Sequence, residues 1–199
     1  LELPEASAVA QTPSGSAALA LAARLVGSCG ARRVFLPDPT WANHAPIMER
    51  AGLEVVPYRY GPAAPERSSR MLEDLAAATS EDLVLVHLCC HNPTGFDLDA
   101  DEWQALAEVV HRRGLSVLVD AAYVGFAGAP ADDVRPISQL AAAAPELYVA
   151  TSCSKNFGLY RERVGALGIL IADGEQRARA AETASAIARA IWSNPPWLG

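Results

Sequence analysis

The chain has 199 residues, 51% of them hydrophobic and 20% charged, which suits one globular domain with a sizeable core and excludes a disordered protein. Its formal net charge of -7 excludes a broad basic surface for nucleic acid or anionic membrane, and no apolar stretch is long enough to span a bilayer. Four cysteines are too few for a disulfide framework and the N-terminus lacks a signal-peptide pattern, so we expect a cytoplasmic protein with a small-molecule partner.

Short apolar runs rich in β-branched residues recur along the chain and have the length of buried strands. These runs are residues 34–36, 53–58, 83–88, 115–119, 147–151 and 167–172. Helical patterns lie between them. The clearest helix begins at Asp99, where Glu102 completes a capping box, and ends at Gly114. Gly30 and Gly52 indicate two earlier helix ends.

A last helix is predicted over residues 176–192, and surface loops are predicted over 61–70 and 125–135. The alternation of strands and helices predicts an α/β fold with three layers, in which helices cover both faces of a mostly parallel central sheet. Ligands of such sheets bind at the carboxyl ends of the strands. The loops that follow the strands are therefore the places to look for a site.

Residues 152–165 (SCSKNFGLYRERVG) follow a predicted strand and hold a lysine, hydroxyls and an arginine. A lysine that forms a Schiff base must lose its proton, which requires a partly desolvated site or a nearby cation. Ser152, Ser154 and Arg163 are residue types that bind phosphate. Lys155 on its own is more simply a solvated surface lysine, but these neighbours favour a site for pyridoxal 5′-phosphate (PLP).

This segment resembles the S-x-S-K-N-x-G-L-Y-x-E-R-x-G signature of aspartate and aromatic amino-acid aminotransferases, which are PLP enzymes of fold type I. The resemblance implies that Lys155 holds PLP as a Schiff base and moves a proton between the substrate Cα and the cofactor C4′. It also implies that Ser152, Ser154 and Arg163 lie at or near the phosphate. Because it extends over essentially the whole chain, it implies that residues 1–199 form the large domain of this fold.

Ser14, Gly15 and Ser16 precede a predicted helix, where backbone N–H groups and the helix dipole favour an anion. Such a segment is by itself more often an ordinary helix cap. It is similar to the S/G-G-T-G-A-L stretch of the family, which cups the cofactor phosphate, although Ala17 replaces a glycine of that pattern. The resemblance implies the same role for these three residues.

Residues 38–44 (DPTWANH) are similar to the family motif N/D-P-x-W-x-N-H. By itself, a tryptophan is about as often a core residue as a ligand contact, and a lone histidine is more often structural. The resemblance implies that Trp41 stacks on the pyridine ring and that His44 supports the aspartate bound to the ring nitrogen.

Residues 87–95 (HLCCHNPTG) first suggest a metal site. We expect no metal, because strand alternation separates the side chains and no second ligand pair follows at zinc-like spacing. The similar family stretch C-C-H-N-P-T-G implies instead that the Asn92 amide hydrogen-bonds the phenolic oxygen of PLP.

Asp120 ends an apolar strand, where a carboxylate is costly unless it meets a cation or a donor. A helix-capping aspartate is the alternative. The family's D-x-A-Y-x-G-F pattern implies that Asp120 binds the protonated pyridine nitrogen and that Tyr123 donates to the phenolic oxygen. Lys155, Asp120 and Tyr123 are thus the expected catalytic residues, and Trp41 and Asn92 are also expected at the substrate.

Arg189 precedes residues 193–196 (SNPP) with the spacing of the family's R-x-x-x-S-N-P-P. Composition alone makes it a solvated helix residue. The resemblance implies that Arg189 crosses the interface of a homodimer and pairs with the distal carboxylate of a substrate in the neighbouring subunit.

The resemblance as a whole implies an aminotransferase that moves an amino group between aspartate, glutamate or an aromatic amino acid and a 2-oxo acid such as 2-oxoglutarate, by a ping-pong mechanism. Family members are about twice this length, so their N-terminal segment, their C-terminal small domain and its α-carboxylate-binding arginine are expected to be absent here. Two alternatives stay open. One is a decarboxylase or lyase of the same fold, and the other is a non-catalytic fragment or pseudoenzyme that serves as a dimerisation module.

Overall fold

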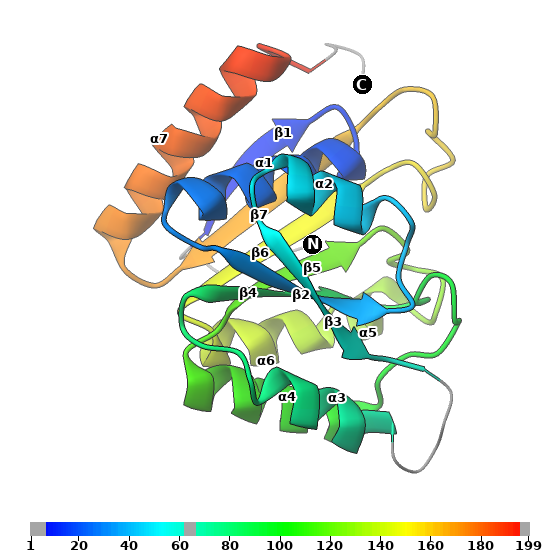
Figure 1. Ribbon diagram of the computed structural model, residues 1–199. Helices are drawn as coiled ribbons and strands as arrows, with labels where there is room; N and C mark the ends of the chain where they lie inside the picture. The colour runs from blue at the N-terminus through cyan, green and yellow to red at the C-terminus, as the bar shows by residue number, and fades with distance from the viewer. Residues whose placement is uncertain (1–6, 62–66, 196–199) are drawn as a thin grey trace.

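A sheet between two layers of helices makes up the computed structural model, which describes residues 7–61 and 67–195 (Figure 1). The strands are β1 (Ser7–Thr12), β2 (Arg33–Asp38), β3 (Glu54–Arg59), β4 (Asp82–His87), β5 (Ser116–Ala121), β6 (Glu146–Ser152) and β7 (Gly165–Ile171). The helices are α1 (Gly15–Ser28), α2 (His44–Arg50), α3 (Arg67–Leu75), α4 (Ala100–Arg113), α5 (Pro130–Asp133), α6 (Arg135–Ala143) and α7 (Gly174–Ile191). Among the described residues, no helix has both the length and the apolar character needed to cross a membrane.

The seven strands found in the described residues are ordered β1-β7-β6-β5-β4-β2-β3. Strands β3, β2, β4, β5 and β6 are parallel, whereas β7 is antiparallel to both of its neighbours, β6 and β1. The prediction of a three-layer α/β fold with a mostly parallel sheet is confirmed. Because the parallel strands end at one edge of the sheet, the loops that follow them come together there.

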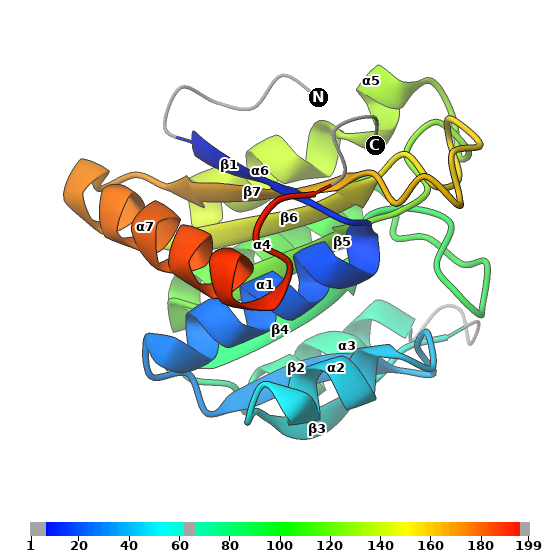
Figure 2. The ribbon, with the colours of Figure 1, turned by 90° about the horizontal axis from the view of Figure 1, so that it is seen from above.

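The central strands are buried on both faces, and their side chains alternate between the two helix layers. In β5, Val117 and Val119 belong to the core under α3, α4 and α6, while Leu118 belongs to the core under α1, α2 and α7. In β6, Leu147 belongs to the first of these cores and Tyr148 to the second. Figure 2 shows α1 and α7 side by side across β6 and β7. This packing fixes the strand ends that carry the site.

All six predicted strands are present, with bounds that differ by one or two residues from the expected runs. The capping box is confirmed, since the Asp99 side chain accepts from the Glu102 N–H at 2.9 Å and the Glu102 side chain accepts from the Asp99 N–H at 2.9 Å. Gly114, Gly30 and Gly52 follow their helices with φ of 65°, 107° and 86°, a conformation that glycine adopts without strain.

The two loop predictions were wrong in part. Residues 67–70 belong to α3, because Met71 and Leu75 give that segment an apolar face that packs into the core; residues 62–66 of the predicted loop lie outside the described residues. The second predicted loop contains α5, which begins at Pro130, and the start of α6. Strand β1 was not predicted, because its short run of small residues has no apolar pattern of its own and is ordered by pairing with β7.

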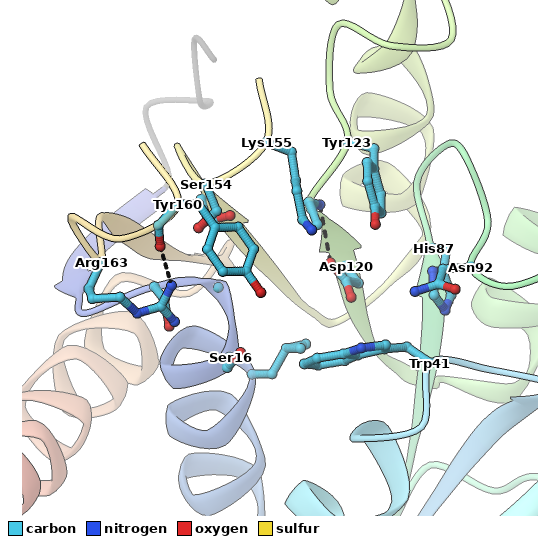
Figure 3. Close-up of a pocket in the computed structure, with 15 residues that line it drawn as sticks. Ser16, Trp41, His87, Asn92, Asp120, Tyr123, Ser154, Lys155, Tyr160 and Arg163 are labelled. Atoms are coloured by element: carbon cyan, nitrogen blue, oxygen red, sulfur yellow. Dashed lines mark hydrogen bonds between the residues drawn. The ribbon is translucent and has the colours of Figure 1, made fainter. Parts of the chain in front are cut away.

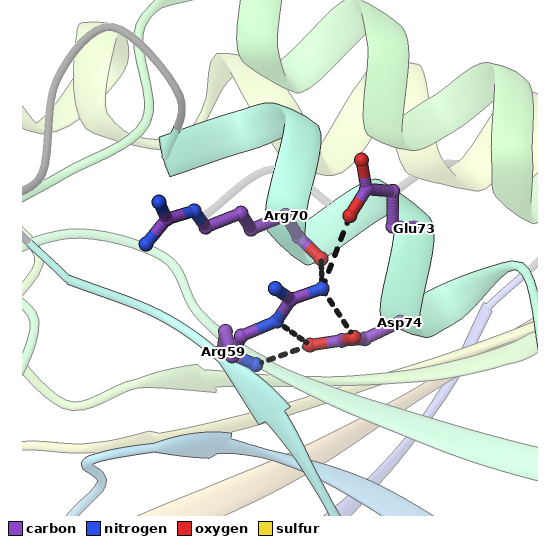
Figure 4. Close-up of polar contacts among 4 residues, drawn as sticks. All are labelled: Arg59, Arg70, Glu73 and Asp74. Atoms are coloured by element: carbon purple, nitrogen blue, oxygen red, sulfur yellow. Dashed lines mark hydrogen bonds and ion pairs between the residues drawn. The ribbon is translucent and has the colours of Figure 1, made fainter.

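Helix α3 is fastened to β3, the strand at one edge of the sheet, by a polar cluster around Arg59 (Figure 4). The Asp74 carboxylate accepts from the Arg59 backbone N–H at 2.8 Å, from Nε at 2.9 Å and from Nη2 at 2.8 Å. Glu73 adds an ion pair to Nη2 at 3.1 Å. The Asp74 carboxylate therefore satisfies an edge-strand N–H and holds the helix in place at the same time.

Candidate active site

A cavity of about 160 Å³ lies where α1 begins and where the loops after β2, β4, β5 and β6 meet (Figure 3). All of the residues expected to contact a cofactor line this one cavity. They are Ser14, Gly15, Ser16, Trp41, Asn92, Asp120, Tyr123, Ser152, Ser154, Lys155 and Arg163. Leu19, His87, Ala122 and Tyr160, which had no predicted role, also contribute to the wall.

The N-terminus of α1 lies at the cavity, because Ser14, Gly15 and Ser16 line it. Ser14 has a φ of 109° and is held in a tight turn, in which its N–H donates to the Thr12 carbonyl and its own carbonyl accepts from the Thr12 hydroxyl, both at 2.8 Å. Within the described part of the chain, the Ser14 hydroxyl does not cap the helix and no acidic side chain lies in its first turn. This end of the cavity therefore attracts an anion.

Gly165, the first residue of β7, makes room for that turn. A Cβ placed on Gly165 would lie 2.5 Å from the Ser14 carbonyl carbon and 2.8 Å from the Thr151 carbonyl oxygen. Both contacts are with backbone atoms, which cannot move without shifting a strand or the turn. Glycine is therefore required where β7, β6 and the turn before α1 meet.

More donors surround the same end of the cavity. Ser152 ends β6 and Ser154 follows it, and both side chains are buried. The guanidinium of Arg163 donates through Nη1 to the Tyr160 carbonyl at 2.8 Å, which leaves its other N–H groups for a ligand. Figure 3 shows Arg163, Ser154 and Ser16 together on one side of the cavity. Two hydroxyls and a guanidinium beside a helix N-terminus form a donor set suited to phosphate.

Asp120 provides a carboxylate at the cavity floor, at the end of β5. Its Oδ2 lies 3.0 Å from His44 Nε2, and its Oδ1 accepts from the Ala122 N–H at 3.1 Å. Burial by itself would raise the pKa of Asp120, but the His44 hydrogen bond and charge and the Ala122 N–H lower the pKa below its ordinary value. The carboxylate is therefore ionised and suits a cationic group of a ligand.

A chain of hydrogen bonds behind Asp120 continues through His44. His44 Nδ1 lies 2.7 Å from the Thr40 hydroxyl, which in turn lies 3.1 Å from His87 Nε2. Burial lowers the pKa of His87 to about 3, so this imidazole is neutral at physiological pH. Sequence reasoning gave Thr40 and His87 no role, although each stands within or beside a quoted motif. His87 is a polar residue at the end of a buried strand, and that signal could have found it, whereas Thr40 lies in the loop after β2 and has no such signal.

Lys155 is the only lysine in the sequence, and it extends over the cavity from the loop after β6. Its Nζ lies 5.7 Å from the centre of the Tyr123 ring and 4.8 Å from the centre of the Tyr160 ring. Figure 3 shows the amine between the carboxylate of Asp120 and these aromatic side chains. The one primary amine among the side chains of this protein is thus in the cavity.

Trp41 and Asn92 lie away from the group around Arg163. Figure 3 shows the Trp41 ring as a flat wall of the cavity, with Asn92 and His87 at one end of it. The edge of the Trp41 ring meets His44 with ring centres 5.3 Å apart, which fixes the orientation of the indole. A flat apolar wall and an amide beside it suit a planar aromatic ligand with a polar substituent.

Arg189 is the predicted site residue that the structure does not bring to this cavity. It is exposed on α7, beside a separate groove that Val9, Ala188 and Trp192 help to line. Ser193, Asn194 and Pro195 follow α7 as expected, whereas Pro196 of the same motif lies outside the described residues.

The fold and the cavity together define a class of protein. A doubly covered α/β sheet presents an amine, a carboxylate, an aromatic wall and a set of anion donors at the carboxyl ends of its strands, which is an arrangement that suits a small phosphorylated ligand. Residues 2–196 match the family model described as aminotransferase class I and II. The chain belongs to this family.

Known proteins of this family are similar along the whole chain. The aromatic-amino-acid aminotransferase of Pseudomonas aeruginosa is 41% identical over 100% of this chain and 50% of its own length. The aspartate aminotransferase of Salmonella typhi is 45% identical over 96% of this chain and 49% of its own. The structure of the aromatic-amino-acid aminotransferase of Burkholderia pseudomallei, covalently bound to pyridoxal phosphate, matches with a TM-score of 0.91 at 36% identity, covering 96% of this chain and 49% of that one. The chain spans about half the length of these relatives.

Proposed function

We propose that this chain is the cofactor-binding part of a PLP-dependent aminotransferase and that residues 1–199 belong to its large domain. The observation that carries the proposal is the position of the only lysine, Lys155, in the same cavity as the ionised Asp120 and a group of phosphate donors. The relatives reported above are aminotransferases, which favours transamination over decarboxylation or elimination. A non-catalytic module would have no need for this set of residues.

The residues of the cavity fit PLP group by group. Backbone N–H groups of residues 14–16, with Ser152, Ser154 and Arg163, would hold the phosphate. The Asp120 carboxylate would pair with the protonated ring nitrogen, and Trp41 would cover the ring face.

Asn92 and Tyr123, from two neighbouring loops, would donate to the phenolic oxygen of the cofactor. When bound, PLP supplies an electron sink that makes the proton on the substrate α carbon acidic. The chain itself contributes fixed charges: Asp120 would keep the ring nitrogen of the bound cofactor protonated, and the hydrogen bond with His44 keeps Asp120 ionised.

Lys155 would act as the nucleophile that binds the cofactor and as the base that takes the proton from the substrate α carbon. It is the only primary amine among the side chains of the sequence, since the other cationic side chains are arginines and histidines. Tyr123, whose ring lies beside the Lys155 Nζ, would help to orient it. The substrates would be an amino acid and a 2-oxo acid.

The partner would be a second copy of the chain, and Arg189 would serve the partner's cavity. Phe157 and Tyr160 in the loop after β6 and Phe126 in the loop after β5 are 71%, 59% and 58% exposed, an apolar surface that favours an interface. In that homodimer Arg189 would pair with the distal carboxylate of aspartate or glutamate. The cytoplasmic location stays a prediction from composition.

Hybrid dimers of the full-length gene product test this function and the position of Arg189 together. Lys155→Ala and Arg189→Leu subunits should each be inactive toward aspartate with 2-oxoglutarate when purified alone. Mixed and allowed to exchange, they should recover activity in up to about a quarter of the sites, because one site of each hybrid joins an intact Lys155 to an intact Arg189. No recovery, with each homodimer still folded, would contradict the use of Arg189 across the interface. Full activity of Lys155→Ala alone would contradict transamination through this lysine.

A further inference from the structure

Asp133 is a buried carboxylate that lies outside the cavity and has no part in the proposed chemistry so far. It is 9% exposed and ends the short helix α5, which follows the loop carrying Tyr123. Burying a carboxylate is costly unless it is hydrogen-bonded. The partners of Asp133 therefore indicate what the residue does.

One Asp133 oxygen, Oδ2, connects two loops of the site. It accepts from the backbone N–H of Gly125 at 2.7 Å, and Gly125 is two residues after Tyr123. It also accepts from the thiol of Cys89 at 3.8 Å, and Cys89 is three residues before Asn92. Burial raises the pKa of the Cys89 thiol well above its ordinary value, so the thiol keeps the proton that it donates. The two loops are thus tied to a single atom.

The loop after β5 has a tight backbone conformation that depends on the hydrogen bond between Gly125 and Asp133. Gly125 has a φ of 91°, and a Cβ on it would lie 3.5 Å from the Pro130 ring, so the chain folds back closely on α5. The Phe126 N–H donates to the Tyr123 carbonyl at 3.1 Å, which closes a turn immediately after the tyrosine. A charge-assisted hydrogen bond at 2.7 Å is a strong restraint on such a turn.

We infer that Asp133 is a positioning residue that holds the Tyr123 loop and the Asn92 loop in register with each other. This inference rests on the proposed function, in which Tyr123 and Asn92 both donate to the phenolic oxygen of PLP. Asp133 acts on them through Gly125 and Cys89 and touches neither the cofactor nor the substrate. Two donors that must meet one oxygen lose their effect when either loop shifts by a fraction of an ångström.

The test compares Asp133→Ala and Asp133→Asn with a matched control, Asp132→Ala. Asp132 is the neighbouring carboxylate, and it is ion-paired at the surface with Arg135. The first readout needs no cofactor: amide hydrogen exchange should rise at least tenfold at residues 123–126 in Asp133→Ala. The exchange at these residues should change little in Asp132→Ala. In Asp133→Asn it should lie between the exchange of the other two variants, because the amide oxygen of the asparagine can still accept from Gly125.

The second readout is a pH titration of the absorbance of the chain with PLP bound. Donation to the phenolic oxygen sets the midpoint of that titration, so Asp133→Ala should move the midpoint in the direction of Tyr123→Phe, whereas Asp132→Ala should leave it in place. Exchange that rises uniformly over the sheet, or an unmoved midpoint in Asp133→Ala, would overturn the inference. If the unsubstituted chain binds no PLP, the proposed function fails, and the exchange at residues 123–126 still decides whether Asp133 holds the loop.

Discussion

Gly165 shows how a single missing side chain shapes the end of the cavity that holds the anion donors. The turn at Ser14 can approach β7 only because no Cβ stands between them. Backbone atoms on both sides make this contact rigid, unlike a contact with the end of a flexible side chain. The backbone N–H groups of α1 are therefore aimed by a residue that lies 151 positions away in the chain from Ser14.

Replacing Gly165 with alanine should weaken PLP binding and lower the free energy of unfolding by about 1–3 kcal/mol, the usual cost of overpacking. PLP binding is measured by titration with tryptophan fluorescence as the signal, and the free energy of unfolding is measured by urea unfolding. Gly174→Ala is the matched control, because a Cβ there would meet the end of the Arg177 side chain at an ordinary 3.7 Å. Equal PLP affinity in both variants would mean that the turn at Ser14 does not hold the phosphate.

At the scale of elements, the outer edge of β3 depends on α3. The Arg59 N–H would have no strand partner on that side, and the Asp74 carboxylate supplies one while it binds the guanidinium in a bidentate pair. Arg59 also lowers the pKa of Asp74, chiefly through the side-chain hydrogen bond, so the carboxylate stays charged.

Asp74→Ala should therefore raise amide exchange at Arg59 and along α3, with little effect on the central strands. Glu73→Ala removes the weaker ion pair on the same helix and should leave that exchange nearly unchanged. Residue-resolved hydrogen exchange measures both variants. Equal protection of the Arg59 amide in the two would show that the edge is not held by Asp74.

The strands and helices differ in how well the sequence alone predicts them. Strands β4 and β5 have continuous apolar runs because both of their faces are buried, and α4 begins at a capping box, so local patterns were sufficient. Strand β1 and helix α5 have no such pattern. Strand β1 is ordered by pairing with β7, which lies far away in the sequence. Helix α5 is ordered by the contacts of Asp133, which depend on the folded loop after β5.

For the whole molecule, three buried histidines and Asp120 form one region, in which His87 and Asp120 line the cavity and His44 and His91 do not. The His87 and His91 rings lie 4.2 Å apart, and His91 stacks on Tyr60 with ring centres 4.0 Å apart. Motifs predicted which residues would come together at the cavity, since each motif has a recognisable spacing. They could not predict Thr40, His87 or Tyr160, whose contacts exist only once separate loops have met.

These histidines should make the protein less stable in mild acid. Burial lowers the pKa of His87 to about 3 and that of His91 to about 4, from 6.5. At a pH between these lowered pKa values and 6.5, the histidines of the unfolded chain bind more protons than those of the folded chain. The free energy of unfolding therefore falls as the pH drops below about 6.5. The slope should approach about 1.4 kcal/mol per pH unit for each histidine. Urea unfolding across this range measures the slope.

His91→Phe, which keeps an aromatic ring to stack on Tyr60, should flatten that dependence, whereas His111→Gln on the exposed face of α4 should not. A slope that is the same in the unsubstituted chain and in His91→Phe would show that this buried histidine does not control stability in acid.

Attachment of the cofactor to Lys155 is simple to test, because the sequence has a single lysine. Incubation with PLP, reduction with borohydride and peptide mapping by mass spectrometry would locate the modified amine. Lys155 is the only lysine of the sequence, so a modified lysine within residues 1–199 can only be Lys155. We predict one stoichiometric adduct on Lys155, reduced many-fold in Asp120→Ala. An adduct confined to the protein's N-terminal α-amino group, or none at all, would contradict this role of Lys155.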